Sequence, residues 1–254
     1  MATENLNNLI AYLLSERPEW NDLAIPTDEL EQFRLYRSLV NIRPAGKASA
    51  EYLKAEDEFL QKLTAQKGIT DIAGLQPVEK NIYLWKGDIT TLKCGAIVNA
   101  ANSGMTGCYH PCHNCIDNCI HTFAGVRLRL KCAEIIKAQG HEEPTGTAKI
   151  TPAYNLPCQY VIHTVGPIVQ DGLTQKHCNL LKSCYQNCLE LAVQSSVKSI
   201  AFCCISTGVF GFPQDKAAEI AVQTVREFLK THDIEVIFNV FTEKDFDIYK
   251  RLLF

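Results

Sequence analysis

Short apolar runs alternate with longer amphipathic stretches from residue 81 to the C-terminus, and this alternation limits the folds that the chain can adopt. We predict strands at residues 82–85, 96–98, 148–151, 160–165, 199–203 and 236–240. We predict helices at residues 117–139, 175–195, 215–231 and 244–253. Strands and helices that alternate in this way form a mostly parallel sheet covered by helices on both faces. Such sheets bind ligands beyond the carboxyl ends of their strands, so a site is expected in the loops that follow strands.

The first eighty residues show a different pattern, with apolar residues at helical spacing. We predict three helices there, around residues 6–14, 30–39 and 49–66. The segment Thr27-Asp28-Glu29-Leu30 can supply the N-cap of the second helix, and Gly68 can close the third. This part of the chain has no acid–base or metal-ligand cluster. We therefore expect residues 1–80 to form a helical extension that packs on the core, as a lid or a partner-docking element, and residues 81–254 to form the main domain.

Size and composition are those of an ordinary globular protein. The 254 residues are 46% hydrophobic and 21% charged, enough for a substantial buried core. The formal charge of -3 gives no long-range attraction for nucleic acid, whose binding surfaces carry a basic excess. No apolar run approaches the roughly 20 residues that cross a bilayer. Because no secretory signal is visible either, we expect a cytoplasmic protein with no nucleic acid or membrane as partner and with its twelve cysteines as free thiols.

The densest chemical feature lies between Gly107 and His121. These fifteen residues contain four cysteines and three histidines, and they follow the segment Ile97-Val98-Asn99-Ala100-Ala101-Asn102. Thiolate and imidazole are the ligands that Zn²⁺ prefers. Asp117 lies two residues beyond Cys115 and would place a carboxylate beside a bound metal. An asparagine loop, a soft-ligand cluster and a carboxylate in one stretch indicate a reaction centre.

A glycine-containing loop, Ser206-Thr207-Gly208-Val209-Phe210-Gly211, lies between a predicted strand and a predicted helix. Its glycines would let backbone N–H groups approach and cradle a phosphate. A plain strand-to-helix turn is the alternative, and the loop taken alone does not distinguish the two. The loop has neither the Gly-Lys-Ser/Thr ending of a P-loop nor the Gly-x-Gly-x-x-Gly dinucleotide fingerprint. Together with Gly87-Asp88 and residues 99–115, it gives three strand-end loops that converge on one predicted site.

Four linked motifs resemble those of the macrodomain family. They are Gly87-Asp88-Ile89-Thr90, Ala96-Ile97-Val98-Asn99-Ala100-Ala101-Asn102, Ile162-His163-Thr164-Val165-Gly166-Pro167 and Ile205-Ser206-Thr207-Gly208-Val209-Phe210-Gly211-Phe212-Pro213. The resemblance runs from about residue 81 to the C-terminus. It implies a three-layer α/β/α sandwich that binds ADP-ribose.

The same resemblance implies roles for individual residues. Asp88 would bond the adenine amine, and Ile89 would offer a backbone N–H to the ligand. Asn102 would face the distal ribose. The residues that would wrap the diphosphate are Ser206, Thr207, Gly208, Val209 and Phe210. Phe241 and Phe246 are both candidates to stack on the adenine.

One departure from the common macrodomain pattern indicates a particular branch of the family. Hydrolytic macrodomains carry a glycine-rich run that ends in a catalytic aspartate, whereas this chain has the cysteine- and histidine-rich residues 107–117 there. That replacement resembles the zinc-dependent microbial branch of the family, which also has a helical N-terminal extension. The branch implies a protein ADP-ribosyl hydrolase. It also implies association with a sirtuin-type ADP-ribosyltransferase and a lipoyl-carrier protein as the modified partner.

The spacing Cys108-x₄-His113-x-Cys115 matches that branch and implies three ligands to one Zn²⁺ per chain. The fourth position would be open to water or substrate, as in most catalytic zinc sites. A closed set that adds Cys112 would instead be structural, and His110 could replace His113. The pair Cys112-x-x-Cys115 also has redox spacing, but the ligand-rich context favours a metal.

We therefore expect a zinc-dependent hydrolase that removes mono-ADP-ribose from modified protein side chains. Asn102 would face the ribose, and Asp117 would orient or deprotonate the attacking water. Cys119, His121 and His163 are expected to pack rather than to bind a ligand. The alternatives are a non-catalytic ADP-ribose reader whose zinc is structural, and a zinc-organised interaction module that docks a partner through its helices.

Overall fold

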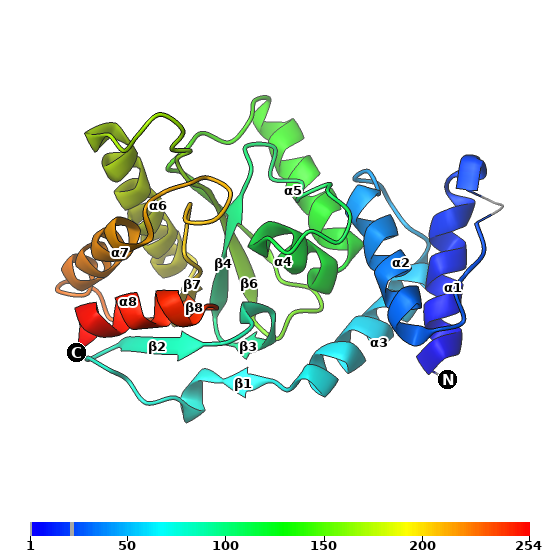
Figure 1. Ribbon diagram of the computed structural model, residues 1–254, viewed down its shortest axis with the longest axis horizontal. Helices are drawn as coiled ribbons and strands as arrows, with labels where there is room; N and C mark the ends of the chain where they lie inside the picture. The colour runs from blue at the N-terminus through cyan, green and yellow to red at the C-terminus, as the bar shows by residue number, and fades with distance from the viewer. Residues whose placement is uncertain (1, 21–22) are drawn as a thin grey trace.

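The computed structural model describes residues 2–20 and 23–254 (Figure 1). Its centre is a six-stranded sheet with the strand order β2-β8-β7-β4-β6-β5. The strands are β2 (Ile82–Lys86), β4 (Ala96–Ala101), β5 (Ala148–Pro152), β6 (Tyr160–Val165), β7 (Ser199–Phe202) and β8 (Glu235–Val240). Every neighbouring pair is parallel except β5 and β6, which are antiparallel. The six predicted strands and the mostly parallel sheet are thereby confirmed.

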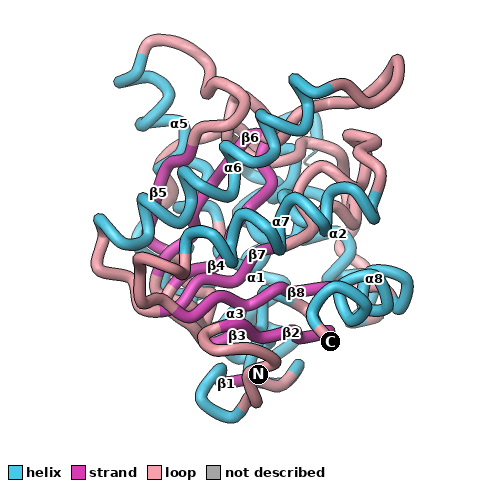
Figure 2. The backbone as a smooth tube through the Cα atoms, turned by 90° about the vertical axis from the view of Figure 1, so that its left-hand side faces the viewer, coloured by secondary structure: helices cyan, strands magenta, loops and turns pink. Residues whose placement is uncertain are grey.

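Helices cover both faces of the sheet. They are α4 (Ile116–Ala124), α5 (Val126–Gln139), α6 (Gln175–Gln194), α7 (Gln214–Phe228) and α8 (Glu243–Leu253). On one face α6, α7 and α8 pack side by side, as Figure 2 shows for α6 and α7, and α4 and α5 contact strands on the other. A strand between two helical layers has no polar face, which explains why Ile97 and Val98 of β4 are both fully buried.

The stretch predicted as one helix over residues 117–139 is two helices, α4 and α5, separated at Gly125. That prediction was wrong because Gly125 has a φ of 89°, which a helix interior does not allow. A Cβ on Gly125 would lie 2.6 Å from Oε2 of Glu56. Glu56 comes from the N-terminal region and accepts a 3.0 Å hydrogen bond from the backbone N–H of Val126, the first residue of α5. A carboxylate from another part of the chain thus occupies the break.

Three helices precede the sheet: α1 (Ala2–Ser15), α2 (Glu29–Ile42) and α3 (Ala50–Lys67). The predicted caps are confirmed, since the Asp28 side chain accepts from the N–H of Glu31 at 3.0 Å and Gly68 ends α3 with a φ of 88°. The three helices share a hydrophobic core of their own, centred on residues such as Ile10, Tyr36 and Leu60. That core also takes in Val126 of α5, which fastens the helices to the sheet layers.

Several short elements join these parts and were not predicted. Strands β1 (Thr70–Asp71) and β3 (Leu92–Lys93) form a separate parallel pair of two residues each, too short for a sequence pattern. Three 3₁₀ turns also occur: η1 (Pro18–Trp20), η2 (Ile72–Gly74) and η3 (Ile89–Thr91). All twelve cysteines are free thiols. No helix in residues 2–20 and 23–254 is long and apolar enough to cross a membrane.

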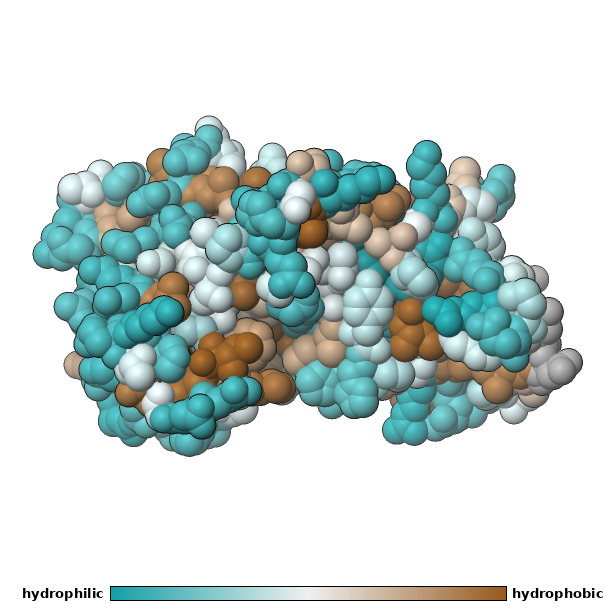
Figure 3. Space-filling model, turned by 90° about the horizontal axis from the view of Figure 1, so that it is seen from above, coloured by the Kyte–Doolittle hydropathy of each residue, from teal (hydrophilic) through white to brown (hydrophobic). Residues whose placement is uncertain are grey.

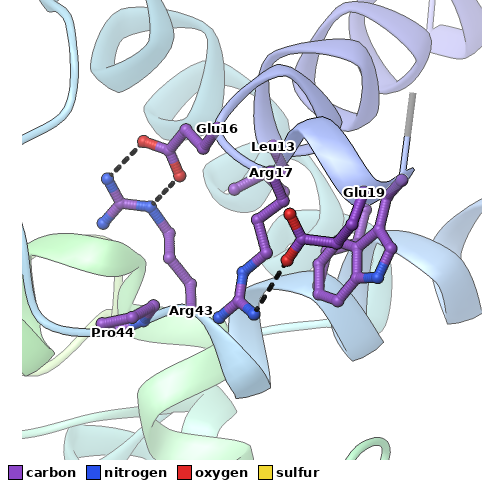
Figure 4. A pocket seen from close by; sticks show the side chains of 8 residues that line it. Leu13, Glu16, Arg17, Glu19, Arg43 and Pro44 are labelled. Atoms are coloured by element: carbon purple, nitrogen blue, oxygen red, sulfur yellow. Dashed lines mark hydrogen bonds and ion pairs between the residues drawn. The ribbon is translucent and has the colours of Figure 1, made fainter.

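A cavity of about 250 Å³ lies among the N-terminal helices (Figure 4). Its lining residues are Leu13, Glu16, Arg17, Glu19, Trp20, Leu39, Arg43 and Pro44. Arg43 forms a two-bonded ion pair with Glu16, at 2.6 and 2.7 Å, so the charged groups on that wall are already neutralised. The cavity shares no residue with the strand-end loops, and the candidate site therefore has to be built from those loops themselves.

Candidate active site

Four adjacent parallel strands end at the same edge of the sheet, and each is followed by a residue that the sequence analysis singled out. Asp88 follows β2, Phe241 follows β8, the loop of residues 203–212 follows β7, and Asn102 follows β4. Because β2, β8, β7 and β4 are neighbours in that order, these residues lie along one edge. Figure 3 views the molecule from above and shows hydrophobic and near-neutral patches interspersed with hydrophilic side chains on that face.

Asp88 begins the η3 turn and is held on both carboxylate oxygens. One oxygen accepts from the backbone N–H of Thr90 at 3.0 Å and from its hydroxyl at 2.6 Å. The other forms an ion pair with Lys67. Burial raises the pKa of the Asp88 carboxyl, but the hydrogen bonds from Lys67 and Thr90 outweigh it and the net pKa is lowered. The backbone N–H of Ile89 donates to no acceptor in the described part of the chain.

The loop of residues 206–210 leaves several backbone donors free. The N–H groups of Gly208, Val209 and Phe210 bond no acceptor among the described residues, and Val209 is 79% exposed. Ser206 adopts a φ of 65°, and its carbonyl accepts from the N–H of Phe212 at 3.0 Å, which closes the loop on itself. Free N–H groups on a closed loop form a concavity suited to an anion.

A second loop supports the first from behind. The N–H of Val169 donates to the carbonyl of Phe210 at 2.8 Å. Gly166 packs so closely that a Cβ there would lie 2.1 Å from Oγ of Ser206. A side chain at position 166 would therefore force Ser206 to move and would disturb the loop of residues 206–210.

Asn99, Asn102 and Asp117 form one hydrogen-bonded group at the end of β4. Asp117, in the first turn of α4, accepts from Nδ2 of Asn99 at 2.8 Å and from Nδ2 of Asn102 at 3.2 Å. Burial raises the pKa of Asp117 to about 6, although the two amides and the Arg129 charge act in the opposite direction. Asn102 also donates to the carbonyl of Gly107 at 3.0 Å, which ties this group to the cysteine-rich loop.

Two buried histidines lie behind this group, where packing was predicted. His163 of β6 accepts or donates at both nitrogens, with Asn99 at 3.1 Å and Thr151 at 2.9 Å. Burial lowers the pKa of His163 to about 3. His121 of α4 lies 3.6 Å from Asp117, and burial holds the pKa of His121 well below its usual range. His121, His163 and Cys132 also form a buried group of possible metal ligands, whose nitrogen and sulfur atoms lie within 4.8 Å of one another.

Cys108, His113 and Cys115 lie together at the surface end of α4. Their ligand atoms are all within 4.8 Å of one another, and Sγ of Cys108 is 3.6 Å from Nδ1 of His113. Typical zinc bond lengths of about 2.3 Å to sulfur and about 2.05 Å to nitrogen, at a tetrahedral angle, give a separation of about 3.6 Å. The three residues present therefore fit a Zn²⁺ ion in both donor chemistry and spacing.

The other possible ligands are directed elsewhere. Cys112 has its Sγ 3.2 Å from the Ser38 hydroxyl of α2 and 3.4 Å from the carbonyl of Arg34. His110 is exposed, with its ring centre 5.5 Å from that of His113. Cys119 is half-buried and accepts a long hydrogen bond from Arg37 at 3.7 Å. Among the described residues, the cluster thus offers three ligands rather than four.

The two aromatic candidates for adenine differ in exposure. Phe241, directly after β8, is 76% exposed. Phe246 packs against the core from α8, with the Lys86 ammonium 5.7 Å from its ring centre. Phe241 is therefore the more accessible of the two rings.

Lys67 is a site residue that could not be recognised from the sequence. It is the last residue of α3, pairs with Asp88, and places its ammonium 3.9 Å from the ring centre of Phe123. Twenty-one residues separate it from Asp88, and no local pattern joins the two. The only sequence signal was Gly68, which predicted that the helix ends beside Lys67.

Comparison with known proteins extends these observations. The family model of the Macro domain matches residues 98–221. A protein-ADP-ribose hydrolase of Treponema medium is 59% identical over 251 residues, which is 96% of each chain. One of Staphylococcus aureus strain MRSA252 is 52% identical over 250 residues, covering 95% of this chain and 94% of that protein. The macrodomain of Trypanosoma brucei in complex with ADP-ribose has a TM-score of 0.67 at 30% identity, covering 86% of this chain and 95% of that one.

The identity to the bacterial relatives extends over nearly the whole chain and so includes the N-terminal helices as well as the sheet. The strand-end loops and the three-layer fold agree with that similarity. This chain therefore belongs to the macrodomain family, among the protein-ADP-ribose hydrolases.

Proposed function

We propose that this protein is a zinc-dependent hydrolase that removes mono-ADP-ribose from modified protein side chains. One observation carries the proposal: the three candidate zinc ligands are joined to the pair Asn102 and Asp117 at the end of β4. Asn102 bonds both Asp117 and the carbonyl of Gly107, the residue directly before Cys108. A metal, an amide and a carboxylate would therefore meet where the family motifs bring the distal ribose.

ADP-ribose would lie along the edge formed by the four strand ends. Asp88 would accept from the adenine amine, with the Ile89 N–H beside it and Phe241 stacking on the ring. The free N–H groups of Gly208, Val209 and Phe210 would bind the diphosphate, within the loop formed by Ser206 and Thr207. This order along the edge leaves the distal ribose at Asn102.

The hydrolysed bond joins the anomeric carbon of that ribose to a protein side chain. Asp117 would orient the attacking water and accept one of its protons while the water oxygen bonds to the anomeric carbon. The bond from that carbon to the protein side chain breaks, and the side chain takes up the proton that Asp117 received. Asn99 and Asn102 fix the Asp117 carboxylate for this task. A zinc ion held by Cys108, His113 and Cys115 would supply Lewis acidity to a ribose hydroxyl or to a water.

A second candidate function is an ADP-ribose reader in which zinc only stiffens the loop. Both oxygens of Asp117 already accept hydrogen bonds from asparagine amides, an arrangement that also suits a purely structural carboxylate. The two functions differ in turnover. A reader would bind a mono-ADP-ribosylated protein and release no ADP-ribose.

The test is single-turnover incubation with a mono-ADP-ribosylated protein, with free ADP-ribose measured over time. The hydrolase releases ADP-ribose in proportion to enzyme, and the reader retains the modified protein unchanged. For the substrate itself, we propose a lipoyl-carrier protein modified by a sirtuin-type transferase, on the basis of the sequence resemblance. Faster release from that carrier than from an unrelated modified protein would support this choice.

A further inference from the structure

Helix α2 contacts the segment that carries the candidate zinc ligands, residues 108–115, here called the ligand loop. The ligand loop has no helix or strand of its own. An irregular loop must be held by its surroundings if three ligand atoms are to stay within bonding distance of one ion. Several of the contacts that hold it come from side chains of α2.

Arg37 makes the central contacts. Its Nη2 donates to the backbone carbonyl of His113 at 2.7 Å and to Oδ1 of Asn118 at 3.0 Å. Its Nη1 lies 3.4 Å from Oδ1 of Asn114. The planar guanidinium thus spans the end of the ligand loop and the first turn of α4, a geometry that a single ammonium cannot reproduce.

Asn118 extends this hold to the beginning of the loop. The side chain that accepts from Arg37 donates in turn to the carbonyl of Cys108 at 3.3 Å and to that of His110 at 3.0 Å. Arg37 therefore fixes the His113 backbone directly and the Cys108 backbone through one intermediate amide. These are two of the three candidate ligands, one from each end of the loop.

The middle of the loop is fastened to the same helix. Oδ1 of Asn41 accepts from the N–H of Cys112 at 2.9 Å, where Cys112 has a φ of 52°. Nδ2 of Asn41 donates to the Thr122 hydroxyl of α4 at 3.0 Å. Residues one turn apart on α2 thus bind successive parts of the ligand loop.

Helix α2 is itself anchored to the sheet layers. Nη1 of Arg129, from α5, donates to the carbonyls of Val40 at 3.0 Å and Asn41 at 2.7 Å, at the C-terminal end of α2. The guanidinium of Arg129 also lies 4.4 Å from the ring centre of Tyr109 in the ligand loop. These bonds hold the C-terminal end of α2 against α5.

We propose that Arg37 is a positioning residue of the metal centre, which holds the ligand loop in the geometry that binds the ion. This rests on the proposed zinc site. It gives the N-terminal helices a role in the chemistry beyond that of a lid, since the loop would be incompletely held without them.

The test compares Arg37→Met, Arg37→Lys and a matched control, Arg34→Met, one turn earlier on α2. Arg34 is exposed and its guanidinium pairs with Glu31 of the same helix. Zinc affinity is measured by competition with a chelator, and ADP-ribose affinity is measured by calorimetry. The rate of hydrolysis is measured at both limiting and saturating zinc. We expect Arg37→Met to bind zinc about 10- to 100-fold more weakly, as is usual when a partner of a metal ligand is lost.

The zinc affinity of Arg37→Lys should lie between those of Arg37→Met and the wild type. Lysine keeps the positive charge but loses the planar guanidinium that donates to several acceptors at once. Both Arg37 variants should keep their ADP-ribose affinity and recover hydrolysis at saturating zinc, and Arg34→Met should match the wild type throughout. Zinc affinity that is unchanged in Arg37→Met would overturn the inference and leave the proposed function intact. Parallel loss of ADP-ribose affinity would also overturn it, because Arg37 would then support the fold in general. A wild-type protein that binds no zinc would overturn both proposals.

Discussion

Nδ2 of Asn102 donates a 3.2 Å hydrogen bond to Oδ2 of Asp117, which joins the end of β4 to the start of α4. Asn99 fixes the other carboxylate oxygen at 2.8 Å. The carboxylate is therefore oriented before any substrate arrives, as a group that directs a water molecule has to be. The pair connects the proposed metal centre to the ribose end of the proposed binding edge.

Asp117→Asn should remove most of the hydrolytic activity while ADP-ribose still binds. The amide is nearly the same size but cannot take a proton from water, so we expect kcat to fall by about 10²- to 10⁴-fold. Rapid-quench measurement of released ADP-ribose gives the rate, and calorimetry gives the affinity. Asp215→Asn, at an exposed carboxylate of α7, is the control and should behave as wild type. Unchanged turnover in Asp117→Asn would remove Asp117 from the mechanism.

Gly166→Ala should weaken ADP-ribose binding without unfolding the protein. The new methyl group would lie 2.1 Å from Oγ of Ser206 and would push the loop of residues 206–210 out of position. We expect the Kd to rise about tenfold or more, which corresponds to about 1.4 kcal/mol. Gly74→Ala is the control, because a Cβ there has no neighbour within 4 Å. An unchanged Kd would show that the loop does not bind the diphosphate.

Glu56→Ala should lower the free energy of unfolding by about 3 kcal/mol or more. The buried carboxylate accepts from the hydroxyls of Tyr36 and Tyr52 at 3.0 Å each and from the N–H of Val126 at 3.0 Å. Each buried donor left without an acceptor costs about 1–3 kcal/mol. Urea unfolding measures the change, with exposed Glu58→Ala as the control. A loss below about 1 kcal/mol would mean that water replaces the carboxylate.

His163 should make the protein less stable as the pH falls from about 6.5 toward 3. Burial lowers the pKa of His163 to about 3, whereas an unfolded histidine takes up its proton near about 6.5. Between these values the unfolded state binds more protons, so stability falls with pH by up to about 1.4 kcal/mol per unit. The groups that face it are His121, whose pKa is also lowered, and Cys132, whose thiol pKa burial raises to about 12.

The measurement is the free energy of unfolding against pH for the wild type and for His163→Asn. The variant lacks the ionisable ring but keeps His121 and Cys132, so its curve should be flatter over this range. Equal slopes in the two proteins would show that His163 titrates normally in the folded state.

Much of the fold could be predicted because its signals are local. Strand runs, the Asp28 N-cap and the Gly68 helix end depend on residues within one or two turns, and all three agree with the structure. The break at Gly125 was missed although a glycine inside a helical pattern is a local signal. The Glu56 carboxylate that accepts from the first N–H group of α5 lies in another helix and could not be predicted. The two-residue strands β1 and β3 carry no periodicity that a sequence pattern can show.

The candidate site likewise contains residues that local patterns predicted and residues that they did not. Cys108, His113 and Cys115 were suggested by spacing and resemblance, and the structure brings their ligand atoms together. The contacts of Arg37 with His113 and of Lys67 with Asp88 join residues that are 76 and 21 positions apart. Such contacts cannot be predicted from local patterns, because α2 and α3, which carry Arg37 and Lys67, have the sequence pattern of ordinary amphipathic helices.

The central claim is most directly tested by zinc content and turnover in the same samples. We expect one zinc per wild-type chain, loss of ADP-ribose release after treatment with a chelator, and recovery when zinc is added back. Cys108→Ser and His113→Ala should lack both metal and turnover but still bind ADP-ribose. Cys112→Ser, whose sulfur faces α2, should keep both. Full hydrolysis by metal-free protein, or by Cys108→Ser, would contradict the account.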